Sequence, residues 1–360
     1  MTLVLGIDIG GTGSRAALGD AGDASPAPRI IDQLTGSRIE IGSNGSTVID
    51  VVRELVRSAA KTWPDRFSEV SGIGIGATGI ASLAEDPSAV LAEISADHGV
   101  PAVAAIDAVT AHLGGLGGTG GAITVLGTGA IAIAHPGPDD AGSWSSAWSR
   151  VDGWGHLFGD RGGGAWIGRQ GLELAMRTHD GIDERGRALL EAATRRFGPP
   201  ASWPGQFYTR NDRAGLLAEF AVDIAETART GDTASAGLLC EAGQEAARSA
   251  IAAARTADHR DRTAGHPDHT ADRLDPTAGH PDHTADNQDC TAGHPIRIAL
   301  TGGVAAAGDQ LVEGFRTEAG RLHPNVTIVE PAGGPLAGAL TLGHLGAGGK
   351  LSAQDRVIWT

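Results

Sequence analysis

The residues best suited to chemistry in this chain are acidic side chains that stand next to glycine-rich turns. Asp8 is separated by a single residue from the run Gly10-Gly11-Thr12-Gly13-Ser14. A glycine turn lets backbone N–H groups approach a phosphate closely, and the hydroxyls of Thr12 and Ser14 could add donors. Asp8 could hold a hydrated Mg²⁺ ion. The same residues would equally well form an ordinary hairpin turn.

A second turn of the same kind, Gly127-Thr128-Gly129, favours the phosphate interpretation. Two such hairpins that face one another could hold the β- and γ-phosphates of a nucleotide from two sides. No G-x-x-x-x-G-K-[ST] motif occurs, which excludes a P-loop enzyme. Lys61 and Lys350 are the only lysines, so phosphate charge would have to be met by Mg²⁺, backbone N–H groups and hydroxyls.

Asp107 stands between an apolar run at residues 103–106 and a predicted helix at residues 108–113. It could cap that helix, which is a common role for Asp. It could also be a general base that takes a proton from a hydroxyl nucleophile. Both roles are compatible, because α/β proteins place catalytic groups at the carboxyl ends of strands beside a cleft.

The densest motif is Gly153-Trp154-Gly155-His156-Leu157-Phe158-Gly159-Asp160, followed by Arg161 and Trp166. Its glycines indicate a loop with close backbone approach. Trp154 offers an apolar face for a sugar ring, and Asp160 could accept hydrogen bonds from sugar hydroxyls. The tryptophans could instead pack in the core, and His156 could either act as a base or order the loop.

Residues 74–79 also match G-x-G-x-x-G after a predicted strand, with Glu93 at a tolerable distance for a ribose contact. This dinucleotide interpretation is weak, because a chain with 55 glycines produces such matches by chance. The motif also lies in the second strand unit of the chain, whereas a dinucleotide fold would place it in the first.

The elements that must position these residues alternate between strand and helix, which is typical of an α/β fold. Strands are predicted at residues 3–9, 14–18, 70–76, 103–106, 122–126, 130–134, 296–300 and 326–329. Helices are predicted at residues 46–63, 88–97, 108–113, 166–178, 185–196, 213–230, 234–256, 310–319 and 336–345. The strand–glycine turn–strand unit at residues 122–134 repeats the one at the N-terminus, which indicates two related halves.

Composition narrows the class of protein. The chain has 360 residues, which favours two domains, and its hydrophobic fraction of 41% excludes wholesale disorder. Its net charge of −15 argues against a nucleic acid or an anionic membrane as partner. Two cysteines, Cys240 and Cys290, cannot build a disulfide framework or a zinc site. Without a signal peptide or an apolar run long enough to span a membrane, we expect a cytoplasmic protein.

One segment lacks the apolar spacing of a helix or a strand. Residues 263–272 recur as residues 277–286, and the repeat starts again at residues 291–295. The segment is rich in histidine and could bind metal. Its polar low complexity instead predicts a disordered insert over residues 258–295.

Taken together, these motifs resemble those of the BadF/BadG/BcrA/BcrD ATPase family. The residues that carry the resemblance are Asp8 with Gly10-Gly11-Thr12, Asp107, Gly127-Thr128-Gly129, the motif at residues 153–160 and Gly302-Gly303. The N-acetylglucosamine kinase branch is the most similar. The resemblance implies two RNase H-like, actin-like ATPase domains at residues 1–114 and 115–345, with a tail at residues 346–360. ATP and a sugar would bind in the cleft between the domains, and the protein would be a homodimer.

The resemblance also implies roles for individual residues. Asp107 would be the base that activates the sugar C6 hydroxyl, and Asp8 would hold Mg²⁺ through water. The residues that would contact ATP and its phosphates are Asp8, Gly10, Gly11, Thr12, Ser14, Thr128, Gly231, Gly302 and Gly303. Those that would bind the sugar are Asn44, Asp107, Gly129, Ala130, Gly153, Trp154, Gly155 and Asp160.

Two departures from the family pattern leave the sugar open. Arg161 stands where the family usually has an acidic residue, and Ala130 where it often has serine, so N-acetylmuramic acid or glucosamine remain alternatives.

Another branch of the family activates 2-hydroxyacyl-CoA dehydratases through an iron–sulfur cluster, but Cys240 falls in a predicted helix and Cys290 in the insert. Sugar-sensing repressors carry a DNA-binding domain, for which a phosphate motif starting at residue 6 leaves no room.

Overall fold

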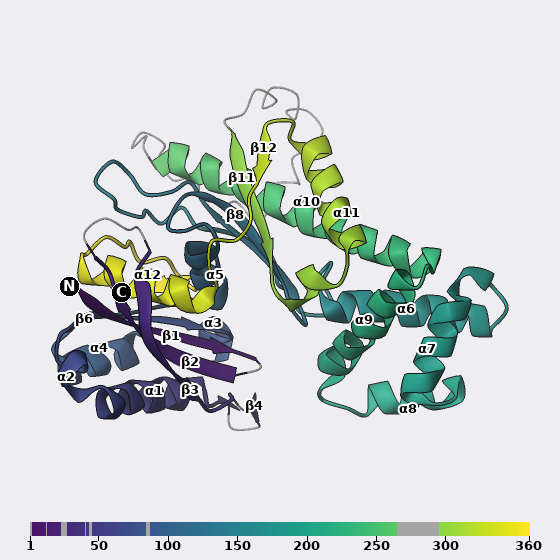
Figure 1. Cartoon of the computed structure of the whole chain (residues 1–360), viewed down its shortest axis with the longest axis horizontal. Coiled ribbons are helices and arrows are strands. Elements are labelled where there is room, and N and C mark those ends of the chain that lie inside the picture. The colour runs from purple at the N-terminus through teal and green to yellow at the C-terminus, as the bar shows by residue number, and fades with distance from the viewer. Residues whose placement is uncertain are drawn as a thin grey trace, which may run out of the picture.

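The computed structural model describes residues 2–11, 13–22, 27–39, 41–42, 45–83, 87–264 and 295–360. They form two lobes, each built on a β-sheet with helices packed against it (Figure 1). The predicted positions Thr12 and Asn44 and most of the repeat insert lie outside the described residues.

The first sheet has the strand order β13-β7-β6-β1-β2-β3. Its strands are β1 (Leu3–Gly10), β2 (Gly13–Asp20), β3 (Arg29–Gly36), β6 (Val70–Ala77), β7 (Ala102–Ile106) and β13 (Ile358–Trp359). Strand β1 pairs antiparallel with β2 and parallel with β6, and its residues from Leu3 to Ile9 are buried on both faces. This double burial explains why β1 reads as a nearly continuous apolar run.

Helices cover both faces of this sheet (Figure 1). One face carries α1 (Val48–Thr62) and α4 (Pro87–His98), and the other carries α12 (Pro335–Ala347) with α5 (Asp107–Gly115) beside it. The buried side of α1 shows the helical spacing that predicts an amphipathic helix, at Val48, Val51, Val52, Leu55, Val56 and Ala59. Short elements complete the lobe: α2 (Pro64–Phe67), α3 (Ile80–Leu83) and the hairpin of β4 (Ile41–Gly42) and β5 (Gly45–Ser46).

The second sheet has the strand order β10-β9-β8-β11-β12. Its strands are β8 (Gly121–Leu126), β9 (Ala130–His135), β10 (Ser149–Asp152), β11 (Ile296–Thr301) and β12 (Val326–Ile328). The long helix α10 (Thr233–Ala264) packs on this sheet, and α11 (Asp309–Leu322) packs along α10. A helical extension lies at the side of the lobe, made of α6 (Gly164–His179), α7 (Arg187–Phe197), α8 (Trp203–Tyr208) and α9 (Arg213–Arg229) (Figure 1).

The two sheets share one topology. In both, the first three strands in sequence form an antiparallel meander, and two later strands add in parallel beside the first of them. The order β3-β2-β1-β6-β7 in one lobe thus corresponds to β10-β9-β8-β11-β12 in the other. This repeat confirms the predicted pair of RNase H-like domains, with β13 as an added edge strand.

The predicted strands and helices are confirmed to within a few residues, with three corrections at larger scale. Helix α10 runs on to Ala264, so residues 258–264 are helical and do not belong to a disordered insert. The stretch from residue 244 to residue 264 has no glycine or proline to stop a helix. Helix α12, expected in the C-terminal domain, packs on the first sheet, and the predicted tail supplies β13, which pairs with β7. The predicted domain limits therefore need both segments moved to the first lobe.

Candidate active site

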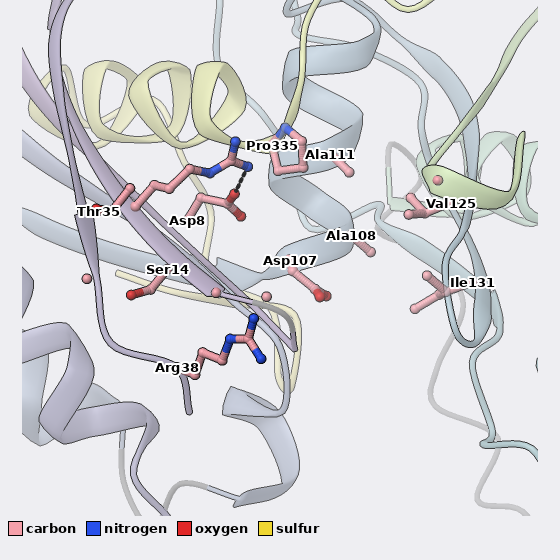
Figure 2. Close-up of a pocket in the computed structure, with 15 residues that line it drawn as sticks. Asp8, Ser14, Thr35, Arg38, Asp107, Ala108, Ala111, Val125, Ile131 and Pro335 are labelled. Carbon is pink, nitrogen blue, oxygen red and sulfur yellow. Dashed lines mark hydrogen bonds and ion pairs between the residues drawn. The ribbon is translucent and has the colours of Figure 1, made fainter. Parts of the chain in front are cut away.

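A cavity of about 660 Å³ lies between the lobes. Figure 2 shows side chains from both lobes around it, with Asp8, Ser14 and Asp107 on one side and Val125 and Ile131 on the other. The full set of lining residues is Asp8, Gly10, Gly13, Ser14, Arg15, Thr35, Gly36, Arg38, Asp107, Ala108, Ala111, Val125, Ile131, Gly303 and Pro335. Five of the predicted site residues are thus brought to one space: Asp8, Gly10, Ser14, Asp107 and Gly303.

Asp107 is the first residue of α5 and follows directly on the carboxyl end of β7. Ile106, in extended conformation, occupies the N-cap position and makes no side-chain cap hydrogen bond, so Asp107 is the first helical residue and not the N-cap residue. Burial raises the pKa of the Asp107 carboxyl, and the nearby charge of Asp8 raises it further. Hydrogen bonds from the Thr78 hydroxyl and the Ala108 N–H act in the opposite direction. A carboxylate with a raised pKa is a stronger base than an ordinary one.

Asp8 is buried and is held by an arginine that the sequence reasoning missed. Arg15 stands directly opposite Asp8 in the β1–β2 pair, and its Nη2 lies 2.6 Å from Asp8 Oδ2. The Arg15 side chain is half exposed, whereas that of Asp8 is almost fully covered. The signal was present in the sequence, because a two-residue turn between Gly10 and Gly13 fixes residue 15 across from residue 8.

The first glycine turn reaches the cavity through Gly10 and Gly13, whereas Gly11 is exposed beside it. Ser14 also lines the cavity, but its hydroxyl donates to the Ser37 carbonyl oxygen at 2.6 Å. A serine hydroxyl has one hydrogen, so in this arrangement Ser14 has no hydrogen left for a phosphate.

The second glycine turn belongs to the other lobe and is fixed by the start of α6. The N–H groups of Gly164 and Ala165 donate to the carbonyl oxygens of Gly127 and Thr128, both at 2.8 Å. Thr128 itself is exposed. Gly302, whose φ is 98°, brings the end of β11 against the end of β8, where a Cβ would overlap the Leu126 backbone. This close approach carries Gly303 to the cavity wall.

A buried carboxylate shapes the loop at residues 153–161. Asp152 accepts hydrogen bonds from the N–H groups of Asp160 at 2.7 Å and Arg161 at 2.9 Å. Asp160 in turn accepts one from the Gly155 N–H at 3.1 Å, and burial raises its pKa. Asp152 was missed by the sequence reasoning, because its partners are fixed only when the loop folds back on it.

Asp160 lies against the second glycine turn, where a Cβ on Gly129 would overlap the Asp160 carboxylate. Gly153 lies against Ile131, which lines the cavity. The predicted sugar-binding residues Gly129, Ala130, Gly153, Gly155 and Asp160 are therefore gathered at the second-lobe edge of the cavity, although none is among its lining residues.

The aromatic and basic residues of this motif divide between surface and core. Trp154 is 66% exposed, with the Arg150 guanidinium 4.9 Å from its ring centroid, whereas Trp166 is buried as a core residue. Arg161 Nη1 lies 3.6 Å from Asp152 Oδ2, so the guanidinium of Arg161 forms an ion pair within the loop. Gly231 lies in the turn between α9 and α10 and does not line the cavity.

The dinucleotide interpretation can also be compared with the structure. Gly74 and Gly76 lie within β6 and pack against α12 and Thr110, so residues 74–79 do not form a dinucleotide-binding turn. Within the described ranges, no group of three or more His, Cys, Asp or Glu side chains is placed to hold a metal ion. No described helix is both long and apolar enough to cross a membrane.

The chain is similar in sequence to one described family. The sequence profile of the BadF/BadG/BcrA/BcrD ATPase family matches residues 5–264. No curated protein matches the chain significantly.

Several solved structures share the fold. A candidate N-acetylglucosamine kinase from Chromobacterium violaceum is 24% identical, with a TM-score of 0.57 over 95% of this chain and 99% of that one. A second candidate N-acetylglucosamine kinase, from Porphyromonas gingivalis, is 14% identical, with a TM-score of 0.57 over 94% and 98%. A ROK family glucokinase from Streptomyces griseus, in complex with glucose and AMPPNP, is 18% identical, with a TM-score of 0.51 over 95% and 99%.

Proposed function

The chain belongs to the BadF/BadG/BcrA/BcrD ATPase family, and from this premise we propose that it is an ATP-dependent amino-sugar kinase. Its acceptor would be the C6 hydroxyl of N-acetylglucosamine or a close relative. The observation that carries the proposal is the position of Asp107, a carboxyl with a raised pKa in a cavity that Gly10 and Gly13 line from one lobe and Gly303 from the other. The names of the two candidate N-acetylglucosamine kinases with the same fold support the choice of sugar.

In the proposed reaction Asp107 accepts the proton of the acceptor hydroxyl. The hydroxyl oxygen then attacks the γ-phosphorus of ATP, the bond to the bridging oxygen breaks, and ADP leaves with the electron pair. Asp107 returns its proton to solvent after the product has left. The raised pKa of Asp107 brings its basicity closer to that of a base working near neutral pH.

The residues around Asp8 fit a magnesium ion bound with the nucleotide. Mg²⁺ usually keeps several waters and is held by one or two carboxylates together with phosphate oxygens. The described cavity wall supplies the two carboxylates Asp8 and Asp107. Asp8 would hold the ion through water, and when bound the ion would neutralise charge on the phosphates.

The sugar would lie at the second-lobe side, where Asp160 offers carboxylate oxygens to its hydroxyls. Arg161 is engaged by Asp152, so it contributes little to a choice between neutral and acidic amino sugars. Cys240, the cysteine in the described part of the chain, lies within helix α10 and not in the glycine-flanked loop that a cluster-binding activator would need. The resemblance supports a homodimer acting on a small-molecule sugar in the cytoplasm.

ADP release by the purified protein tests this function. Mg-ATP would be offered with N-acetylglucosamine, N-acetylmuramic acid, glucosamine, N-acetylmannosamine, glucose or no sugar. We expect sugar-dependent release, lowered about 10²- to 10⁴-fold in Asp107→Asn. Asp97→Asn, on the exposed side of α4, is the matched control and should behave as wild type. Release that ignores every sugar, or an unaffected Asp107→Asn, would contradict the proposal.

A further inference from the structure

Arg38 lines the same cavity as Asp107, and the kinase reaction proposed above gives it no role. Figure 2 shows its side chain extending from the end of β3 toward the side of the cavity where Asp107 lies. Among the residues that the structure describes, no carboxylate forms an ion pair with Arg38. Arg15, the other arginine of the cavity, is held by Asp8.

The backbone that carries Arg38 is fixed on two sides. Gly36 is wedged between Leu55 of α1 and Ser14 of β2, where an added Cβ would be too close to both. The Ser37 carbonyl oxygen accepts the Ser14 hydroxyl hydrogen at 2.6 Å, and the Ser37 hydroxyl donates to Glu54 Oε2 at 3.1 Å. The guanidinium is therefore presented by an anchored segment at the cavity wall.

The charges of the cavity give this arginine a specific use. The cavity lining carries two carboxyl groups, Asp8 and Asp107, and Arg15 pairs with Asp8; the described lining residues include no lysine. Among the described residues of this wall, Arg38 is thus the cation whose charge is not matched by a carboxylate. Its planar fork of N–H donors suits two oxygens of a phosphoryl or carboxylate group.

We propose that Arg38 binds an oxyanion next to the hydroxyl that Asp107 deprotonates. The inference rests on the proposed kinase function and adds a residue to its site. Two sources supply the same chemistry: the phosphoryl group in transfer, or a carboxylate carried by an acidic amino sugar. Arg38 is exposed at the cavity wall, and a positive charge at this place would stabilise either one.

The test compares steady-state kinetics of Arg38→Met, Arg38→Lys and wild type, with Mg-ATP and either N-acetylglucosamine or N-acetylmuramic acid. Arg29→Met is the matched control, because Arg29 is an exposed arginine at the opposite end of β3 and outside the cavity. We expect Arg38→Met to lose about 10²-fold in kcat/KM, and Arg38→Lys to lose less because it keeps the charge. Arg29→Met should match wild type.

The pattern of loss identifies the oxyanion. If Arg38 binds the phosphoryl group in transfer, kcat falls for both sugars by a similar factor. If it binds a substrate carboxylate, KM rises for N-acetylmuramic acid alone. Wild-type kinetics of Arg38→Met with both sugars would overturn the inference.

The kinase proposal could fail independently of the inference about Arg38. In that case the wild-type protein would release no ADP with any sugar. Calorimetric titration with Mg-ATP and with N-acetylmuramic acid then still tests Arg38. A dissociation constant at least tenfold weaker in Arg38→Met for one of the two supports an oxyanion site, and unchanged constants for both overturn it.

Discussion

At the scale of single residues, the same feature that suits Asp107 to catalysis makes it costly to the fold. Burial raises its pKa, which means that the native state disfavours the ionised carboxylate. The contribution of Asp107 to stability is therefore most favourable below the ordinary pKa of Asp and is lost as the pH rises through the raised value. The base must nevertheless be ionised to accept a proton, so activity and stability depend on pH in opposite directions.

We therefore predict that Asp107→Asn raises the melting temperature at pH 7 while it lowers turnover. The gain in melting temperature should shrink as the pH falls toward the ordinary pKa of Asp, because protonated Asp107 carries no such cost. In wild type, kcat/KM should rise with pH through the raised pKa. Thermal unfolding and initial rates over one pH series measure both effects. A less stable Asp107→Asn would show that the carboxylate is favourably solvated.

Residues of this site differ in how far the sequence could predict them. Asp8, Asp107 and the glycine turns were recognisable because each stands at the end of an apolar run. Arg15 was accessible through hairpin register. Arg38 and Asp152 were not, because their neighbours come from segments that meet only in the folded protein.

At the scale of elements, the first lobe depends on a close contact between α12 and its neighbours. A Cβ on Gly338 would overlap the Thr110 carbonyl oxygen of α5, and one on Gly74 would overlap the Ala339 carbonyl oxygen of α12. These positions leave no flexible side chain that could move aside, because backbone lies on both sides of each contact. The position of α5, and with it Asp107, is thus fixed by the approach of α12.

Gly338→Ala is expected to destabilise the protein by about 1–3 kcal/mol, because the new methyl group must push two helices apart. Gly320→Ala, at an exposed position of α11 where a Cβ meets nothing, is the control and should be neutral or stabilising by up to about 1 kcal/mol. Denaturant titration of both variants measures the difference. Equal stabilities would mean that α12 is free to shift.

Periodicity predicted most helices and strands but not the edges of the sheets. Strand β3 is an edge strand whose apolar residues Ile30, Ile31 and Leu34 do not alternate with polar ones, so its sequence carries no strand signal. Strand β13 has two residues and exists because β7 offers it an edge. Such elements follow from tertiary contacts, which the local sequence does not contain.

At the scale of the whole molecule, the segment from Lys350 to Trp359 connects the two lobes. Trp144 and Trp148, from the second lobe, stack at 5.5 Å between ring centroids, and His112 of α5 meets the Trp148 ring at 5.0 Å. Burial lowers the pKa of His112 to about 3, which keeps it neutral in this cluster. Gln354 accepts the Trp148 N–H at 3.0 Å and donates to the Trp148 carbonyl oxygen at 2.9 Å. The segment continues into β13 on the first sheet.

We predict that Gln354→Ala lowers the free energy of unfolding by about 1–3 kcal/mol, because the peptide groups at Trp148 lose these partners. Gln33→Ala, on the exposed strand β3, is the control and should change little. Thermal unfolding and limited proteolysis near Trp148 report the loss. An unchanged Gln354→Ala protein would show that the carbonyl oxygen needs only Arg260, whose Nη1 lies 2.6 Å from it, and that losing the acceptor of the Trp148 N–H costs little.

Helix α12 follows the whole second lobe in the sequence, and this order has a consequence for biosynthesis. The central strands of the first sheet leave the ribosome early, but the helix that covers one of their faces is made only after the entire second lobe. During that interval the face around Val4 and Ala17, which packs against Leu336 and Leu340 of α12, has no cover, and such exposed surface invites aggregation. The second lobe is continuous in sequence up to β12 and can fold while still tethered. The nascent first lobe is therefore where a ribosome-associated chaperone would be needed most.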